Sequence, residues 1–244
     1  GDVVGGGNSI SHLEAGNAFP DLKMIIPYYD GFFPSKSVNV PELLELGARN
    51  VHYTQLGYDP CTHYPVQPTR EEYDAYKSQI AFIGTYTPAR AACLEQMGKY
   101  SLSVWGTHWN RKRHGARLRK AIKNRIACGM KFSLVANSSR INLNLLREEN
   151  RDTHNLKTFE LPACGAFVIS QRSEELAQFY TEGNEIAAFD TIEELQDKSA
   201  YYLRHEEERI RIARAGYQRT KAEKYTIRDR LGTLLAVYNE MKMS

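Results

Sequence analysis

The chain has 244 residues, 42% of them hydrophobic and 25% charged, and its formal net charge is +3. These values describe an ordinary soluble chain, long enough for one large domain or two small ones. Its apolar runs fall far short of the roughly 20 residues of a membrane-spanning helix, and no basic and then apolar leader is seen, so we expect neither a transmembrane segment nor a secretory signal.

The cysteines and the first residues give little sign of a site. The four cysteines, at positions 61, 93, 128 and 164, lack the close pairing of metal or redox motifs, which favours reduced thiols in the cytoplasm. The glycine-rich start at residues 1–8 has no full G-x-G-x-x-G fingerprint, so a plain turn is favoured over a phosphate-binding loop. No DxD-type metal motif is found, and we predict no metal site.

The part before residue 76 is short for a domain. A complete Rossmann-like half usually takes more than about a hundred residues, so we expect part of a domain here and a chain that is a fragment or a trimmed form. The passage from Tyr58 to Tyr76 contains three prolines and ends in the helix-start signal Thr69-Arg-Glu-Glu72. It is predicted to be an interdomain linker that leads into a helix.

From residue 79 onward, strand-like runs alternate with helical ones. Strands are expected at residues 79–84, 100–105, 140–145, 166–169 and 186–189, with a helix over 88–99 and further helices after nearly every strand. This alternation predicts an α/β fold with a parallel sheet covered by helices on both faces.

After residue 192 the chain is mostly charged and helical. Apolar residues at helical spacing predict packed outer helices; they are Ile210, Ala213, Tyr217, Leu231, Leu235 and Tyr238. We place a sheet domain at residues 76–225 and a carboxyl-terminal helix at 226–244.

The turn after the first predicted strand has the features of a phosphate site. Gly84 permits close approach of the backbone, Thr85 follows it, and Arg90 lies in the first turn of the next helix. This is the position at which Rossmann-like units bind phosphate. The alternative is an arginine that only solvates the end of a helix.

Residues 155–170 place one carboxylate in an otherwise apolar helix, turn and strand. Asp152 or Thr153 is suited to begin the helix, and Gly165 is suited to end it in the left-handed conformation. Leu156, Phe159 and Ala163 fall on one stripe, which leaves Glu160 at its edge. An arbitrary glutamate in this position is more often a surface residue than a ligand.

Residues 96–147 contain no acidic side chain but many lysines and arginines. Residues 117–126 can form a helix with Leu118, Ile122 and Ile126 on one face and cations elsewhere, the footprint of a binder of nucleic acid or of another anionic surface. Trp105 and Trp109 bracket a turn suited to stacking on a base, although tryptophans at strand ends are more often core. A solvated basic face or an anionic acceptor site is favoured over nucleic acid.

The peptide Lys157-Thr-Phe-Glu-Leu-Pro-Ala-Cys-Gly-Ala-Phe-Val-Ile resembles the signature of CgeB-like (spore maturation type) glycosyltransferases, relatives of the group-one glycosyltransferases with the GT-B fold. Residues 80–85, 139–144 and 180–189 also resemble that family, so the resemblance covers roughly residues 25–235 in family order. It implies a GT-B-like chain whose residues 1–75 are a partial, acceptor-side Rossmann-like domain with its linker. It also implies that residues 76–225 hold the donor.

The resemblance implies a metal-independent, hexosyltransferase-like enzyme that uses a UDP-, GDP- or ADP-sugar and no cofactor. Glu160 would contact the ribose hydroxyls, and Lys157 matches an Arg or Lys of the family. The predicted donor-binding residues are Gly84, Thr85, Arg90, Asn144, His154, Asn155, Lys157, Glu160, Gly165 and Ala166. The acceptor, a glycan, a protein or a small molecule, is not identified.

The catalytic base is not identified either. His12, Asp30 and His52 are weak candidates, because a lone histidine or aspartate is more often a cap or a satisfied polar residue. Two other functions stay open. The short amino-terminal part favours a non-catalytic nucleotide-binding or interaction module, and the basic stretch 111–125 favours binding of nucleic acid.

Overall fold

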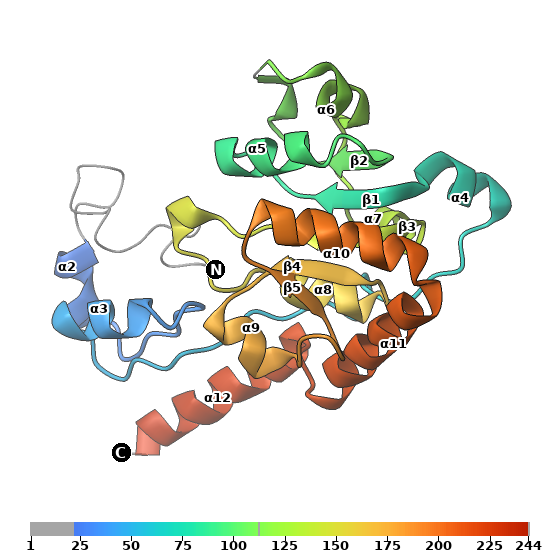
Figure 1. The fold of residues 1–244 in the computed structure, drawn as a ribbon. Coiled ribbons are helices and arrows are strands. Elements are labelled where there is room, and N and C mark those ends of the chain that lie inside the picture. Colours follow the sequence, from blue (N-terminus) through green and yellow to red (C-terminus); the bar gives the residue numbers. More distant parts are fainter. Residues whose placement is uncertain (1–21, 112, 244) are drawn as a thin grey trace.

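A parallel five-stranded sheet with helices on both faces forms the centre of the molecule (Figure 1). The computed structural model describes residues 22–111 and 113–243. The strands are β1 (Ser78–Ile83), β2 (Leu102–Trp105), β3 (Ser139–Asn144), β4 (Val168–Gln171) and β5 (Ala187–Phe189). All five predicted strands are therefore confirmed to within two residues at each end, as is the α/β fold.

The strand order β2-β1-β3-β4-β5 creates a crevice beside β1. From β1 the chain moves to β2 on one side, and it then returns to β3 on the other side of β1. Ligands of open α/β sheets bind at the carboxyl ends of the strands where the order reverses in this way. The expected position is thus between the carboxyl ends of β1 and β3.

Two apolar cores cover the two faces of the sheet, because side chains of a strand alternate between faces. On one face Ala81 and Ile83 of β1 pack with α7 (Met130–Asn137), α8 (Lys157–Ala163) and α9 (Glu174–Phe179). On the other face Ile80 and Phe82 pack with α5 (Pro88–Gln96), α6 (Ala116–Ala121), α10 (Ile192–Arg204) and α11 (Glu206–Ala222). Helices thus cover both faces, as predicted.

The described amino-terminal residues form short helices rather than strands. They are α2 (Leu22–Ile25), the 3-10 turn η2 (Ile26–Tyr28), α3 (Asn39–Glu45) and α4 (Arg70–Tyr76), with one isolated parallel bridge between Phe32 and Val51. The predicted helix start is confirmed, because Thr69 and Glu72 form a capping box at the start of α4. The linker is held to the far end of the chain, where the Tyr58 amide donates to the Tyr225 carbonyl at 3.0 Å.

The prediction of a packed last helix is wrong. In α12 (Ile227–Met243) no residue is buried, and Leu231 and Leu235 are 53% and 60% exposed. Helical spacing predicts that one face of α12 is apolar, but it does not predict what packs against that face. In the structure α12 extends away from the sheet past α9 (Figure 1). Ile210 of α11 is also exposed. No described helix combines the length and apolarity that crossing a bilayer requires.

The basic helix predicted over residues 117–126 is also partly wrong. α6 ends at Ala121, and Ile122 is extended and forms a parallel bridge with Val104 at the edge of β2. Leu118 is buried, but Ile126 is 57% exposed. Pairing with the sheet has overridden the local helical pattern, because a tertiary contact outweighs a weak propensity.

Gly216 allows α11 to pack closely on the loop before β5. A Cβ atom at this position would lie 2.3 Å from the carbonyl oxygen of Glu185. We expect Gly216→Ala to lower the free energy of unfolding by about 2 kcal/mol, since backbone has to move. Chemical denaturation measures the loss. The control is Gly232→Ala in α12, where no described atom outside the helix's own backbone lies within 4 Å of the added Cβ and helix propensity predicts a small gain. Equal losses in both variants would contradict the packing argument.

Candidate functional site

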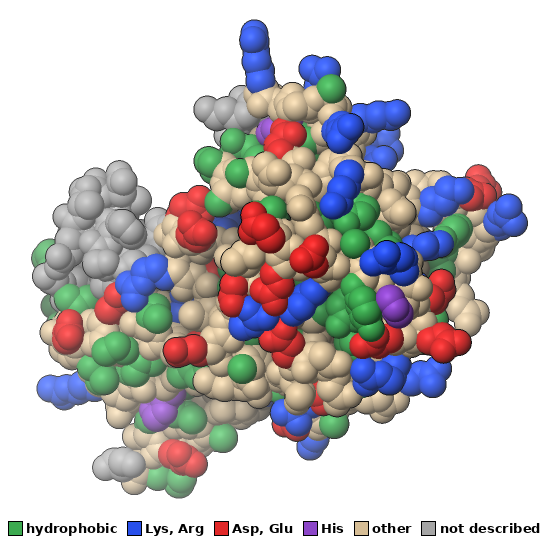
Figure 2. All heavy atoms as spheres, viewed as in Figure 1, with side chains coloured by type: hydrophobic (Ala, Val, Ile, Leu, Met, Phe, Trp, Pro, Cys, Tyr) green, Lys and Arg blue, Asp and Glu red, His purple; other side chains and the backbone are tan. Residues whose placement is uncertain are grey.

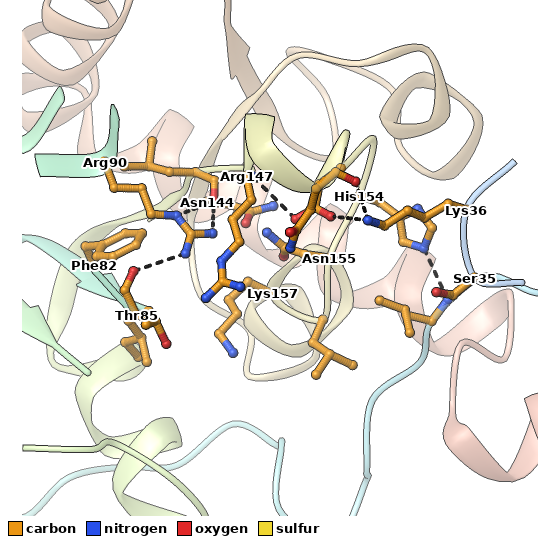
Figure 3. Close-up of a pocket in the computed structure, with 17 residues that line it drawn as sticks. Ser35, Lys36, Phe82, Thr85, Arg90, Asn144, Arg147, His154, Asn155 and Lys157 are labelled. Carbon is orange, nitrogen blue, oxygen red and sulfur yellow. Dashed lines mark hydrogen bonds and ion pairs between the residues drawn. The ribbon is translucent and has the colours of Figure 1, made fainter. Parts of the chain in front are cut away.

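A cavity of about 390 Å³ lies at the carboxyl ends of β1 and β3, where the strand order reverses (Figure 3). Its walls come from the two strand ends, from the loop before α8 and from the amino-terminal part. Seven of the ten predicted donor residues line it: Gly84, Thr85, Arg90, Asn144, His154, Asn155 and Lys157. The structure therefore brings together residues that are far apart in the sequence.

Arg90 holds the two strand-end loops together. Its Nε and Nη2 donate to the Leu145 carbonyl at 3.2 and 2.6 Å, and its Nη1 donates to the Thr85 carbonyl at 3.1 Å. Burial, and after it the nearby Arg147, lower the pKa of Arg90 to about 10. Because a guanidinium has five N–H groups, one donor on Nη1 and one on Nη2 remain. Arg90 thus links the two loops and keeps two N–H donors that are available for a ligand.

Arg147 and Lys157 supply cations that extend into the cavity (Figure 3). The guanidinium of Arg147 makes no hydrogen bond or ion pair with any described residue. The Lys157 Nζ lies 3.2 Å from Oε2 of Glu160 and 5.6 Å from the centre of the Phe132 ring. A third cation, Lys36, comes from the amino-terminal part and pairs with Asp152 at 3.0 Å. The cavity is therefore electropositive.

His154 is a buried wall of the cavity rather than a free ligand. Its Nδ1 lies 2.5 Å from Oε2 of Glu175, and its Nε2 accepts a hydrogen bond from the Leu56 amide at 3.2 Å. Both ring nitrogens are thus engaged by groups of the chain. His154 therefore joins the backbone just before the linker to α9.

Glu175 is the centre of this buried network. Its carboxylate accepts from the Ser37 amide at 3.3 Å, from the Thr153 hydroxyl at 2.6 Å and from His154. Burial alone raises the pKa of Glu175, but these hydrogen bonds outweigh it and lower the pKa to about 2. The network joins the amino-terminal part to the sheet domain beside the cavity.

The start of α8 differs from the prediction. Asp152 and Thr153 do not cap the helix, because Asp152 pairs with Lys36 and Thr153 donates to Glu175. Asn155 takes this role instead, since its Oδ1 accepts from the Thr158 amide at 3.3 Å. The prediction of the helix end is confirmed: Gly165 follows α8 with φ +69°.

Glu160, Gly165 and Ala166 do not line the cavity. Glu160 is buried one turn below Lys157, and Nε2 of His63 lies 3.6 Å from its Oε1. Its Oε2 is fully buried and has no hydrogen-bond partner apart from the ion pair with Lys157. Gly165 packs near Pro65 of the linker, at the amino-terminal end of β4. Only Glu160 is therefore coupled to the cavity, through Lys157.

The polar floor of the cavity is Asn144, at the end of β3. Its Nδ2 donates to the hydroxyls of Thr158 and Ser170, both at 3.1 Å, whereas its buried Oδ1 has no hydrogen-bond partner. A buried acceptor of this kind usually has a partner such as water or a ligand.

Neither of the two candidate bases that the structure describes, Asp30 and His52, lies at the cavity. His12 lies outside the described residues. Asp30 is exposed, and the ring of His52 stacks on Phe33 at 5.8 Å; neither residue lines the cavity. Among the described residues, no three potential His, Cys, Asp or Glu ligands converge as at a metal site.

The two tryptophans are core residues. Trp105 and Trp109 are 5% and 1% exposed, and Nε1 of Trp109 donates to the Gly84 carbonyl at 2.9 Å. Stacking of a nucleic-acid base on either ring is therefore blocked. Trp109 instead fixes the Gly84 turn at the cavity.

The donor prediction omitted Lys36 and Arg147. Arg147 follows β3 by three residues, so its place at a strand end gave a usable signal. Lys36 has no such signal in the sequence, because only the folding of the amino-terminal part against residues 150–152 brings Lys36 to the cavity.

Comparisons with known proteins agree with this geometry. A sequence model of the family described as glycosyl transferase-like matches residues 90–236, whereas no curated protein matches the chain. Sucrose-phosphate synthase from Thermosynechococcus elongatus superimposes with a TM-score of 0.69 at 13% identity, over 96% of this chain and 66% of that one. HepE of Anabaena, in complex with UDP, gives a TM-score of 0.67 at 8% identity, over 90% of this chain and 66% of that one.

A third structure is a single carboxyl-terminal domain. The carboxyl-terminal domain of a group 1 family glycosyl transferase (LpcC) from Francisella tularensis has a TM-score of 0.53 at 15% identity, over 70% of this chain and 100% of that one. At these identities the likenesses show the fold alone, and the chain spans 66% of the first two relatives. The family match, however, covers more than half of the sequence, and the chain therefore belongs to the glycosyl transferase-like family, with a Rossmann-like sheet domain as in GT-B glycosyltransferases.

Proposed function

We propose that the chain binds a nucleotide-sugar in the cavity at β1 and β3 and belongs to an enzyme that transfers the glycosyl group to an acceptor. The observation that carries the proposal is the convergence of Arg147 and Lys157 on the Gly84-Thr85 turn. Two phosphates need several positive charges and donors, and this arrangement supplies both in one half-enclosed place.

The leaving nucleoside diphosphate would be stabilised by side chains and amides rather than by a metal. The guanidinium of Arg147 has no partner among the described residues, and Arg90 keeps two N–H groups that make no hydrogen bond with them. Donors that are fixed before the reaction stabilise developing charge well, since they do not reorganise during it. The structural relatives solved with UDP and with UDP-glucose support a nucleotide-sugar donor of this class.

Glu160 does not line the cavity in the free chain, and we propose that it accepts hydrogen bonds from the ribose hydroxyls once Lys157 turns away from it. Its Oε2 is buried, lacks a hydrogen bond and lies 3.2 Å from Lys157 Nζ. When Lys157 turns toward a phosphate, this oxygen loses its only cation and becomes a strong acceptor for a hydroxyl. The same movement would couple recognition of the ribose to that of the phosphates.

Thermal shift with UDP-, GDP- and ADP-sugars tests the proposal. One of the three is expected to stabilise the chain, and Glu160→Gln is expected to weaken its binding about tenfold, because a carboxylate accepts hydroxyl donors better than an amide. Glu174→Gln, at an exposed site on α9, is the control. Stabilisation by none of the sugars, or an equal shift in Glu160→Gln and the unaltered chain, would refute the assignment.

A second candidate is a nucleotide-binding module without transferase activity. It is favoured by the amino-terminal part, whose described residues form short helices and one isolated bridge. Release of free sugar from the stabilising donor distinguishes the two functions: an enzyme hydrolyses the donor slowly without acceptor, whereas a binding module leaves it intact.

A further inference from the structure

Charge is distributed very unevenly along this chain. Residues 96–147 contain twelve Lys and Arg and no Asp or Glu, whereas the remaining residues contain 20 basic and 29 acidic side chains, a net charge of −9. A separation of this size gives the molecule a strongly positive side, which orients it toward anionic partners.

The positive side is a protruding edge of the sheet domain. Six described cations on and around α6 are all exposed, and we name them the basic patch: Arg113, Arg117, Arg119, Lys120, Lys123 and Arg125. None of the six makes an ion pair or a side-chain hydrogen bond with a described residue. Figures 1 and 2 show α6 at the top of the molecule, with blue side chains projecting from it. Ion pairs with the described residues therefore do not neutralise these charges.

The base of the patch is firmly held. Leu118 is fully buried, Ile122 bridges to Val104 of β2, and the Arg125 carbonyl accepts from the Gly106 amide at 2.9 Å. The carboxylate of Glu95 accepts from the Gly115 amide, just before α6, at 2.8 Å. The cations are thus presented on a rigid support, which reduces the entropy lost when they bind a surface.

An apolar side chain lies among these charges. Ile126 follows Arg125 directly and is 57% exposed, because α6 ends before it. Cations around an exposed aliphatic side chain suit a bilayer, whose phosphates attract the cations and whose interior accepts the apolar group. Single-stranded nucleic acid needs aromatic platforms instead, and Trp105 and Trp109 are buried.

We propose that the basic patch docks the chain on an anionic phospholipid surface, with Ile126 entering the interfacial region. The patch shares no side chain with the nucleotide cavity, so docking leaves the cavity accessible. Because each surface cation contributes roughly fivefold to partitioning onto anionic lipid, the patch provides most of the attraction.

Cosedimentation with vesicles of equimolar phosphatidylcholine and phosphatidylglycerol tests the docking. We expect the chain to bind these vesicles, to ignore pure phosphatidylcholine, and to dissociate in high salt, which screens exposed charge. The triple variant Arg119→Glu, Lys120→Glu, Lys123→Glu is expected to bind at least about a hundredfold more weakly, since three cations are lost and three negative charges are added. The shift given by the stabilising nucleotide should be unchanged in this variant.

The matched control carries the same change of charge elsewhere: Arg214→Glu, Lys221→Glu, Arg228→Glu, three exposed positions on and after α11. It should bind within about twofold of the unaltered chain, because charge outside the patch acts only at long range. An equal loss of vesicle binding in the control would refute the basic patch as the docking site. If Ile126→Ser did not weaken binding to the vesicles, docking on a bilayer would be refuted. Tighter binding to double-stranded RNA than to vesicles, at an equal concentration of phosphate, would refute it as well.

Discussion

Replacing Glu175 with glutamine is expected to lower the free energy of unfolding by about 3 kcal/mol near pH 7. The carboxylate accepts hydrogen bonds from Ser37, Thr153 and His154, and it is 4% exposed. An amide has one acceptor oxygen, and its NH2 group would face donors that need an acceptor. Chemical denaturation measures the loss. Glu174→Gln is the control on the same helix, and it should change stability by no more than about 0.5 kcal/mol.

The same variant predicts a dependence on pH. The pKa of Glu175 is lowered from its ordinary value of 4.5 to about 2 in the folded chain. Its stabilisation is therefore complete above the unfolded value and is lost as the pH falls through the folded one. The difference between the unaltered chain and Glu175→Gln should shrink between about pH 5 and pH 2. A difference that grows on acidification would contradict the role of the ionised carboxylate.

The sheet could be predicted because its strands are buried on both faces. Residues 80–83 read as an apolar run, whereas residues 141–144 alternate apolar and polar side chains, and both patterns indicate a strand. The Gly165 turn and the Thr69 capping box were likewise visible, since both depend on neighbouring residues. Local chemistry thus predicted the elements and the general place of the site.

The rest depends on contacts between distant residues. Neither Lys36 beside Asp152 nor Ser37 beside Glu175 leaves a trace in the local pattern, since more than a hundred residues separate each pair. The same cause explains the errors. Ile122 pairs with Val104 instead of continuing a helix, and α12 has the apolar stripe of a packed helix although none of its residues is buried by the described part of the chain. Periodicity predicts which face is apolar but not what lies against it.

Arg147→Gln is expected to weaken binding of the stabilising nucleoside diphosphate roughly 10- to 100-fold, the range for losing a charge-assisted hydrogen bond. The parent nucleoside, which has no phosphate, should bind equally well to both chains. Isothermal titration with the two ligands measures the difference. Arg140→Gln is the matched control, because Arg140 is an exposed arginine at the opposite end of β3 and does not line the cavity.

Stability should change in the opposite direction from binding. Arg147 is one of the causes that lower the pKa of Arg90, so the two guanidinium groups repel each other in the free chain. Removing Arg147 relieves this repulsion and breaks no ion pair with a described residue, so free Arg147→Gln should be at least as stable as the unaltered chain. Replacing a residue with a purely structural role would have the reverse effect: the chain would be less stable, and its affinity for the nucleotide would be unchanged. Weaker binding without a loss of stability is therefore the result that identifies Arg147 as a ligand of the phosphates.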